Sequence, residues 1–327
     1  MNSSGDNNVL SLSQRLSSAL GVKFEDCSLR GPIYRLQNSL IYHAECAGQP
    51  FPLMVKRCLM PNTLVTDTST ARVQYDALSR AKSVTVGDSR YNVPMPVALL
   101  EQEGVVVMEW IEGVGMTPLL LRLRGARAER LKLVAEAAEW LRRFHRSSGV
   151  TYARLAAREM LPRLTADPSP VLADEACREG IAALERTCGL VDALDVGGGY
   201  PHGDFKSDNL LVCSGRIVAI DIHHEEKNSV LFDIAMFLNH LELLALHPRG
   251  MRLAWERVDL IRAFLKRYFH GVTIPELPLV WVRLFVLLGA WIDLPQENPG
   301  WLRYHYMDLC YRRIASRLTR GLKALKA

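Results

Sequence analysis

The amino-acid sequence predicts an α+β protein with two lobes: an N-terminal lobe built on an antiparallel sheet and a larger, mainly helical C-terminal lobe. Two observations carry this prediction. Up to about residue 112, apolar residues gather in short runs rich in β-branched side chains and separated by turns. Beyond Gly115, they recur with the period of an amphipathic helix. The 327 residues, 49% of them hydrophobic, are enough for two such lobes and exclude a disordered or low-complexity chain.

The N-terminal lobe is expected to follow a short arm. Residues 1–20 are polar and rich in Ser and Asn, which is typical of a flexible N-terminal arm. We assign residues 21–111 to the first lobe and residues 112–327 to the second. The strands predicted in the first lobe are 27–36, 40–46, 51–58, 97–100 and 105–110, and one helix is predicted at 70–82.

The second lobe is predicted to contain mostly helices, interrupted once by a hairpin. The hairpin joins strands 210–213 and 216–220 through a turn at Ser214 and Gly215. The run of three glycines at residues 197–199 is expected to end the helix before it. The predicted helices are 128–145, 173–194, 231–246, 252–269, 277–292 and 301–327.

Composition excludes several classes of protein. The net charge of +5 is too mild to indicate a nucleic-acid partner. No run reaches the roughly 20 apolar residues needed to span a bilayer, and residues 1–21 do not have the pattern of a secretory signal. The seven cysteines are odd in number, widely scattered and without metal-ligand spacing. We therefore expect no zinc site and no disulfide framework, and a reducing, cytoplasmic location.

The residues that carry chemistry gather around the hairpin. The stretch 200–212 reads YPHGDFKSDNLLV and places Asp204 and Asn209 five residues apart in a loop before the first strand. Asp221 follows the second strand, and Asp233 opens the next helix. Phosphoryl transfer needs a base that orients a hydroxyl and oxygen ligands that hold Mg²⁺ on the phosphates. One aspartate, one asparagine and a second aspartate supply that set.

This order of motifs resembles the aminoglycoside phosphotransferase and choline kinase family, whose members are relatives of the protein kinases; the loop is also close to their H-R-D-L-x-x-x-N pattern. The resemblance implies a protein-kinase-like fold and a cofactor set of ATP and Mg²⁺. It makes Asp204 the catalytic base, places Lys206 facing the transferred phosphate, and gives Asn209 and Asp221 as magnesium ligands. Asp233 would brace the catalytic loop.

The same resemblance makes the first lobe a nucleotide-binding lobe. A kinase-like fold needs a lysine on its third strand to hold the α- and β-phosphates. Lys56 lies at the end of the hydrophobic run 51–58 and fits that position. The run 105–113 resembles the hinge strand, where adenine would bond to backbone groups near Glu109 and Ile111.

Two departures from the family pattern concern the phosphate contacts. The position of the family's helix glutamate, which pairs with the strand lysine, is Gln74 in this chain. Asp76 lies about 200° further around the helix, so it would partner Lys56 only after a shift in register. We expect Gln74 to be a nucleotide-site residue, and whether Gln74 or Asp76 is the partner of Lys56 stays open. The expected phosphate loop, residues 29–36, contains a single glycine, Gly31.

Two further clusters of charged or titratable residues stand out in the sequence. Adjacent side chains on an extended segment point in opposite directions, so we expect no separate metal site in the run 223–226, HHEE. Residues 301–327 carry seven Lys or Arg against one Asp. This basic helix is either a solvated face or a weak contact with a membrane surface or an anionic acceptor.

We therefore expect a magnesium-dependent kinase of a hydroxyl on a small molecule or sugar, such as an aminoglycoside, an amino alcohol or a saccharide. The alternatives are a catalytically weak, pseudokinase-like nucleotide-binding module and a kinase of a cell-envelope glycan. Only eleven residues separate Asp221 from Asp233, which leaves no room for the activation segment of a protein kinase. The acceptor, the choice between ATP and GTP, and the oligomeric state stay open.

Overall fold

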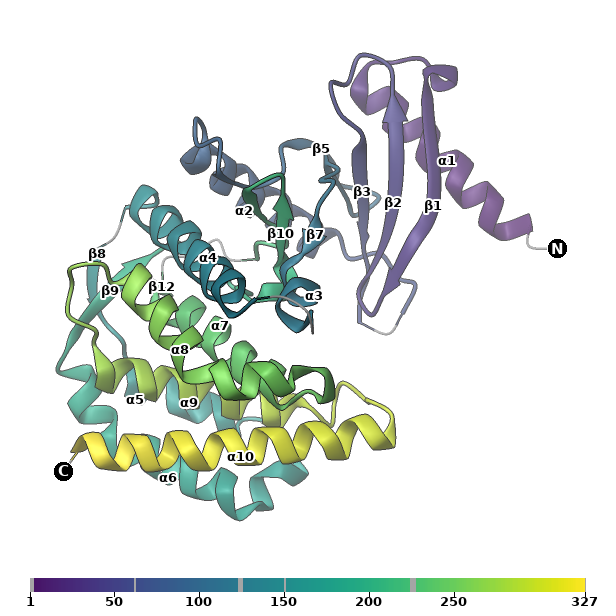
Figure 1. Ribbon diagram of the computed structural model, residues 1–327. Coiled ribbons are helices and arrows are strands. Elements are labelled where there is room, and N and C mark those ends of the chain that lie inside the picture. Colours follow the sequence, from purple (N-terminus) through teal and green to yellow (C-terminus); the bar gives the residue numbers. More distant parts are fainter. Residues whose placement is uncertain (1–2, 62, 123–125, 150, 224–227, 327) are drawn as a thin grey trace. The chain divides into compact units, whose positions relative to one another are not determined.

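The computed structural model describes residues 3–61, 63–122, 126–149, 151–223 and 228–326, and the chain divides into two compact units (Figure 1). Unit 1 comprises Met1–Val114 and Leu211–Glu225, and unit 2 comprises Gly115–Leu210 and Glu226–Ala327. The expected lobe boundary at residue 111 lies just before the end of the first segment. The chain then returns to unit 1 for residues 211–225, a return that the expected division did not contain.

Unit 1 is built on two sheets. In the larger, antiparallel sheet the strand order is β1-β2-β3-β6-β5, and in the smaller one it is β4-β11-β10-β7. The strands of the larger sheet are β1 (Cys27–Leu36), β2 (Ser39–Cys46), β3 (Leu53–Cys58), β5 (Pro96–Leu100) and β6 (Val105–Glu109). Those of the smaller sheet are β4 (Tyr91–Asn92), β7 (Val114–Gly115), β10 (Leu210–Cys213) and β11 (Arg216–Ala219).

The centre of the larger sheet is buried on both faces, and this explains its sequence. Val105, Val106 and Val107 on β6 have no exposed surface, so β6 is a continuous β-branched run. On β3, Leu53 and Val55 are equally buried. The register pairs Lys56 with Ile41 on one side and with Val106 on the other. The lysine is thereby fixed in the middle of the sheet.

The N-terminal arm is a helix, α1 (Ser3–Leu20), rather than a flexible segment. Its Leu12 and Leu16 are 7% and 0% exposed and belong to the hydrophobic core that includes β1, β2 and β3. The apolar residues of α1 form a narrow stripe at helical spacing among mainly polar neighbours. A second helix, α2 (Thr68–Thr85), packs against β3, β5 and β6. Its N-terminus is capped by Asp67, whose carboxylate accepts from the Thr70 amide.

The expected phosphate loop is part of β1. The β1–β2 register shifts between Arg30 and Tyr34, so the strand bulges there, and the backbone of Gly31 has φ +129°. A side chain at Gly31 would meet the amide nitrogen of Ile33 at 2.6 Å. The single glycine of this segment is therefore required by the bulge.

One cysteine pair departs from the sequence-based expectation. Cys27 and Cys46 are register partners at the ends of β1 and β2, and they form a disulfide. The remaining cysteines, Cys58, Cys177, Cys188, Cys213 and Cys310, are buried and free. The sequence predicted no disulfide framework, and this single pair was not foreseen, because strand register rather than sequence spacing brings the two side chains together.

Unit 2 is mainly helical, as predicted. Helix α4 packs against α8, α7 packs against α8 and α9, and the yellow C-terminal helix α10 packs against α9 and α6 (Figure 1). Its α-helices are α3 (Met116–Leu121), α4 (Arg127–Ser147), α5 (Ala157–Met160), α6 (Glu175–Asp192), α7 (Leu231–Leu246), α8 (Met251–Tyr268), α9 (Glu276–Asp293) and α10 (Trp301–Lys326). The 3-10 turns are η2 (Leu161–Thr165), η3 (Pro170–Ala173), η4 (Ser207–Asn209) and η5 (Pro248–Gly250); η1 (Phe24–Asp26) lies in unit 1.

A small sheet in unit 2 was not predicted. Its order is β12-β9-β8, formed by β8 (Thr151–Arg154), β9 (Asp195–Gly199) and β12 (Asn228–Ser229). The three glycines expected to be a break lie inside β9. A side chain at Gly199 would come within 3.3 Å of the Ser148 hydroxyl. The glycines thus allow this strand to pass close to its neighbours.

In unit 2, aromatic side chains form a core around the loop that precedes β10. Trp140 on α4 stacks on Phe144 and on Phe205, at ring-centre distances of 5.0 and 5.6 Å. Phe205 contacts Phe237 on α7, which stacks on Phe264 of α8 at 4.6 Å. The loop around residue 205 is therefore fixed by its own core residue. Among the described residues, no helix is long and apolar enough to cross a membrane.

The packing of α1 generates a stability prediction. Leu16→Ala should lower the free energy of unfolding by about 2–5 kcal/mol, because it removes a fully buried side chain and leaves a cavity. Leu10→Ala in the same helix is the matched control, since Leu10 is 56% exposed. Urea unfolding of both variants measures the difference. Equal midpoints would show that α1 does not pack on the sheet.

Candidate functional site

Unit 1 contains a cavity of about 300 Å³ whose lining is largely apolar. Met54 of β3, Met108 of β6 and Leu211 of β10 contribute apolar surface. Lys56, Gln74 and Asp221, and the aromatic side chains of Tyr34 and Trp110, also line it. An apolar chamber with a few polar groups is the usual form of a site for a small molecule or cofactor.

The two predicted hinge residues differ in their relation to this cavity. Ile111 lines it. Glu109 is not among its lining residues: its amide donates to the Met95 carbonyl at 2.9 Å, and its carboxylate accepts from the Met95 amide at 3.1 Å. The Glu109 side chain therefore bonds to the segment just before β5 rather than lining the cavity. The backbone beside the cavity is that of the residues leading from Glu109 to Ile111.

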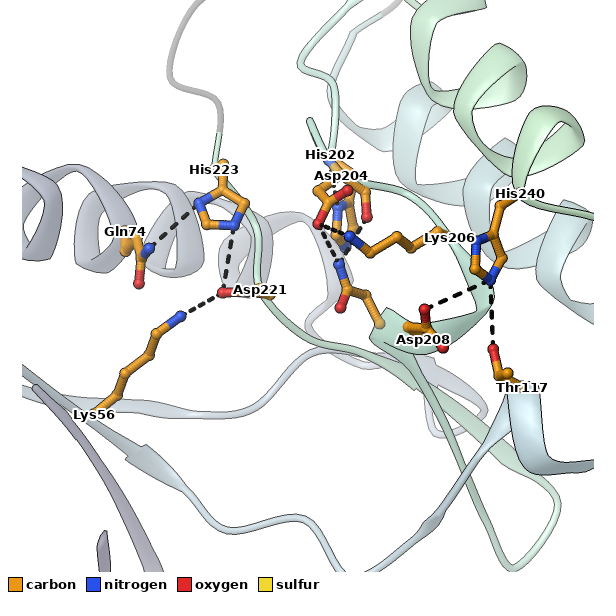
Figure 2. A network of polar contacts seen from close by, with 11 residues as sticks. Lys56, Gln74, Thr117, His202, Asp204, Lys206, Asp208, Asp221, His223 and His240 are labelled. Carbon is orange, nitrogen blue, oxygen red and sulfur yellow. Dashed lines mark hydrogen bonds and ion pairs between the residues drawn. The ribbon is translucent and has the colours of Figure 1, made fainter. Parts of the chain in front are cut away.

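Lys56 is paired with a carboxylate, but not with one on helix α2. Its ammonium donates to Asp221 Oδ1 at 2.5 Å (Figure 2). Neither Gln74 nor Asp76 is among the partners that the structure describes for Lys56. The structure therefore gives a third answer to the question of the lysine's partner. The Lys56 side chain is 11% exposed and that of Asp221 33%, so the pair is partly shielded from water.

Asp221 adopts an unusual backbone conformation directly after β11. Its φ is +64°, a left-handed value that is uncommon outside glycine and concentrates at functional sites. Burial alone would raise the pKa of its carboxyl group, but the neighbouring His223 imidazole and the Lys56 ammonium outweigh burial and hold the pKa well below its usual range. The group is therefore ionised at neutral pH.

Gln74 has partners other than the expected lysine. Its Nε2 lies 3.3 Å from His223 Nδ1, and its Oε1 accepts from the Cys58 thiol at 3.7 Å. His223 in turn places Nε2 at 3.4 Å from Asp221 Oδ1. Figure 2 shows the imidazole ring between the Gln74 amide and the Asp221 carboxylate. Gln74, the residue that departs from the family pattern, therefore contacts His223, which follows Asp221 by two residues.

Unit 2 carries the second half of the predicted site. Asn209 Nδ2 donates both to the Asp204 carbonyl at 2.9 Å and to Asp204 Oδ2 at 2.8 Å. Lys206 Nζ lies 2.7 Å from the same carboxylate oxygen (Figure 2). The Asp204 side chain is 30% exposed, so it is held in place and still open to a reactant. The loop brings together Asp204, Lys206 and Asn209, as the sequence predicted.

The loop itself is anchored by Asp233, which is fully buried at the start of α7. Its carboxylate accepts from the amides of His202 and Gly203 at 2.7 and 2.9 Å, and from His145 Nε2 at 2.9 Å. Burial would raise the pKa of this carboxyl, but the hydrogen bond from His145 and the other donors hold it below its usual value. The bracing contacts expected of Asp233 are present.

A polar cluster adjoins the loop within unit 2. Thr117 of α3 and Ser207 of the loop share a hydrogen bond of 2.6 Å between their hydroxyls. His240 of α7 lies 3.5 Å from the Thr117 hydroxyl and 3.7 Å from the Asp208 carboxylate (Figure 2). Burial lowers the pKa of His240, against the opposing effect of Asp208. These contacts hold the part of the loop around Ser207 and Asp208.

The predicted magnesium ligands offer the right atoms. Both described hydrogen bonds of the Asn209 side chain use its NH₂ group, so its carbonyl oxygen is the atom it can present to a cation. Asp221 is an ionised carboxylate. Hard oxygen donors of these two kinds are the ligands that Mg²⁺ takes in proteins. The residues present therefore fit the metal that the family pattern implies.

One residue of the site was missed. The run 223–226 was expected to hold no separate metal site, yet His223 contacts Asp221; residues 224–226 lie outside the described part of the chain. The available signal was its spacing. Residues two apart on an extended segment point to the same side, so Asp221 and His223 could have been paired from the sequence.

Solved structures of known proteins share this architecture. A choline/ethanolamine kinase family protein from Mesorhizobium loti is 17% identical, with a TM-score of 0.64 over 97% of this chain and 95% of that one. The amicoumacin kinase hAmiN, solved with AMP-PNP, Ca²⁺ and Ami, is 13% identical, with a TM-score of 0.62 over 96% of each chain. A glucosamine kinase is 16% identical, with a TM-score of 0.61 over 96% of this chain and 87% of its own. The predicted protein-kinase-like fold is confirmed.

Sequence comparison leads to the same group. No curated protein matches the chain. A family model does match, over residues 75–257, which is more than half of the chain and includes the catalytic loop, Asp221 and Asp233. The resemblance stated from the motifs is confirmed, and the chain belongs to the phosphotransferase enzyme family, APH.

Proposed function

We propose that this protein is an ATP-dependent kinase that phosphorylates a hydroxyl of a small molecule or sugar with the help of Mg²⁺. The observation that carries the proposal is the loop of unit 2, in which a partly exposed Asp204 carboxylate is held by Asn209 and Lys206. Membership of the phosphotransferase family supports the reaction type. The acceptor class is supported by the solved neighbours.

In the proposed reaction, Asp204 accepts a hydrogen bond from the acceptor hydroxyl and takes its proton as the bond to phosphorus forms. The acceptor oxygen attacks the γ-phosphorus in line, and the bond from that phosphorus to the β,γ-bridging oxygen breaks. Lys206 lies 2.7 Å from Asp204 Oδ2 and supplies positive charge beside the base. It would then face the transferred phosphoryl group.

Asn209 and Asp221 would hold Mg²⁺, which neutralises phosphate charge when it is bound. In unit 1, the cavity would take the nucleotide, with adenine against its apolar lining and the backbone of residues 109–111. Lys56 would contact the phosphates. Gln74 would act in the same site through His223 rather than by holding the lysine.

The proposed acceptors are aminoglycoside-like, amino-alcohol-like or saccharide-like molecules. Choline or ethanolamine, glucosamine and amicoumacin appear in the names of the three solved neighbours, which supports this range of chemistry. Nucleic acid is not a proposed partner. The cytoplasm, where ATP is available, is the proposed location, and in that reducing compartment the Cys27–Cys46 pair would be open to reduction.

Two alternatives have different support. A pseudokinase-like module is favoured by Gln74, since the helix glutamate is absent, but Lys56 has a carboxylate partner in Asp221. A cell-envelope glycan kinase with peripheral membrane contact was suggested by the basic helix α10. Three of that helix's basic side chains are used internally: Arg312 pairs with Asp174, Arg317 with Glu242 and Lys323 with Glu179. These ion pairs within the protein weaken the case for a membrane contact through α10.

An ATP-consumption screen tests the proposal directly. Purified protein is incubated with ATP and Mg²⁺ and with aminoglycosides, amino alcohols, sugars or envelope glycans. Acceptor-dependent ADP release with one chemical class identifies the acceptor. Nucleotide binding without turnover under every condition would favour the pseudokinase-like alternative. A protein inactivated at Asp204 serves as the background control.

The first prediction separates binding from chemistry. Asp204→Asn should lower the rate of phosphoryl transfer by about 10²–10⁴-fold, the range for loss of a general base. Nucleotide affinity should be unchanged, because the nucleotide cavity lies in unit 1. Single-turnover kinetics and nucleotide titration measure the two quantities. Asp195→Asn, at an exposed aspartate of β9, is the matched control. Full activity in Asp204→Asn would remove this residue from the mechanism.

The second prediction concerns the metal. Asp221→Ala should abolish Mg²⁺-dependent ATP binding more completely than Asn209→Ala, because it removes a charged ligand and the partner of Lys56. Calorimetric titration of ATP with and without Mg²⁺ measures this. Asp76→Ala should leave binding unchanged, since Asp76 is not among the described partners of Lys56. The assignment fails if wild type and Asp221→Ala bind ATP equally well in Mg²⁺.

A further inference from the structure

His223 occupies a position that neither the reaction nor the family motifs account for. It lies two residues after Asp221, with its Nε2 at 3.4 Å from Asp221 Oδ1. Its other ring nitrogen, Nδ1, lies 3.3 Å from the Gln74 amide. All three side chains belong to unit 1, and the ring is fixed from both ends (Figure 2). A histidine held in this way has one nitrogen committed to its support and one directed at a carboxylate.

The spacing between the two facing atoms is that of neighbouring metal ligands. Two donor atoms bound at right angles to one cation, each at about 2.0–2.1 Å, lie about 3 Å apart. The observed 3.4 Å is close to this value, whereas it is long for an N–H···O hydrogen bond, which falls near 2.7–3.2 Å. Lys56 donates to the same Oδ1 atom, and a carboxylate oxygen has a further lone pair that it can offer to a cation.

Gln74 supplies the support that a ligating histidine needs. Such a histidine donates its second ring N–H to a carbonyl or carboxylate, which fixes the ring and its tautomer. The Gln74 Oε1 atom, after a half-turn of the amide, is a carbonyl acceptor facing Nδ1. The contact at its other end persists in either orientation, because the Cys58 thiol both donates and accepts weakly.

We infer that His223 is an additional ligand, through Nε2, of the divalent cation bound by Asp221, and that Gln74 is the residue that positions its ring. This inference rests on the metal assignment of the proposed function. It also gives Gln74 and His223 a common role. Where a glutamate would hold the strand lysine, a neutral glutamine instead holds a histidine that faces the metal carboxylate.

The consequence is a change of metal preference. Mg²⁺ favours oxygen ligands, whereas first-row transition ions accept imidazole nitrogen readily. The protein–ATP complex should therefore bind Mn²⁺ more tightly than an oxygen-only site would. Removal of the imidazole should weaken Mn²⁺ binding by about tenfold, near the lower end of the range for perturbed metal sites, and should change Mg²⁺ binding by less than about twofold.

Pulsed electron paramagnetic resonance on Mn²⁺ tests this without reference to activity. Full-length protein labelled with ¹⁵N only in histidine is loaded with Mn²⁺ and ATP, so that protein nitrogen is distinguished from the ¹⁴N of adenine. The wild type should show ¹⁵N hyperfine coupling from a directly bound imidazole. His223→Phe should lose it, and Gln74→Leu should reduce it. Gln74→Glu, which retains an acceptor for Nδ1, should keep it.

His305→Phe is the matched control, because His305 is an exposed histidine of α10 in unit 2 and should leave the coupling intact. Mn²⁺ binding that depends on Asp221 but shows no ¹⁵N coupling in the wild type would overturn the inference and leave the proposed function standing. Mn²⁺–ATP binding that survives Asp221→Ala unchanged would overturn both. If His223→Phe does not fold, the labelled wild type alone still decides whether an imidazole is bound.

Discussion

The loop of unit 2 that carries Asp204 depends on a single buried charge. Asp233 has no exposed surface, and an ionised carboxylate in such a place is tolerated only when all its surroundings donate to it. The donors come from the loop, through the amides of His202 and Gly203, and from α4, through His145. His145 also bonds the Tyr268 hydroxyl of α8 at 2.7 Å. One carboxylate therefore ties the loop to three helices, and the position of Asp204 follows from it.

In unit 1, the corresponding constraint is the strand register. It places Lys56 between Ile41 and Val106, where its stem is buried and its ammonium reaches Asp221. A lysine in this setting needs an anionic partner, and the chain supplies one from the far end of the hairpin rather than from α2. The residue at position 74 of α2 is therefore not needed to neutralise Lys56. A neutral Gln74 is compatible with this arrangement, and its amide contacts His223.

Much of this could be predicted from the sequence where local chemistry decides the outcome. The β-branched run of β6, the apolar period of α7 and the order Asp204, Asn209, Asp221, Asp233 all specify their structure locally. The rest depends on partners distant in sequence. Helix α1 is stabilised by a sheet that its own composition does not reveal, and β9 is a strand because its glycines allow close approach. The Cys27–Cys46 pair and the partner of Lys56 are products of register and hairpin geometry, which spacing along the chain does not encode.

The division of the chain has a consequence during synthesis on the ribosome. Unit 1 is discontinuous, so β4 and β7 have no strand partner until β10 and β11 have left the exit tunnel. About 110 residues separate Val114 from Glu225, and at roughly 5–20 residues per second their translation takes on the order of 6–20 s. For that time the nascent chain carries two unpaired strand edges, which are natural targets for chaperones and for misassembly. Asp221, which lines the cavity of unit 1, is also among the last residues that this unit receives, so the cavity is complete only after the first segment of unit 2, Gly115–Leu210, has been translated.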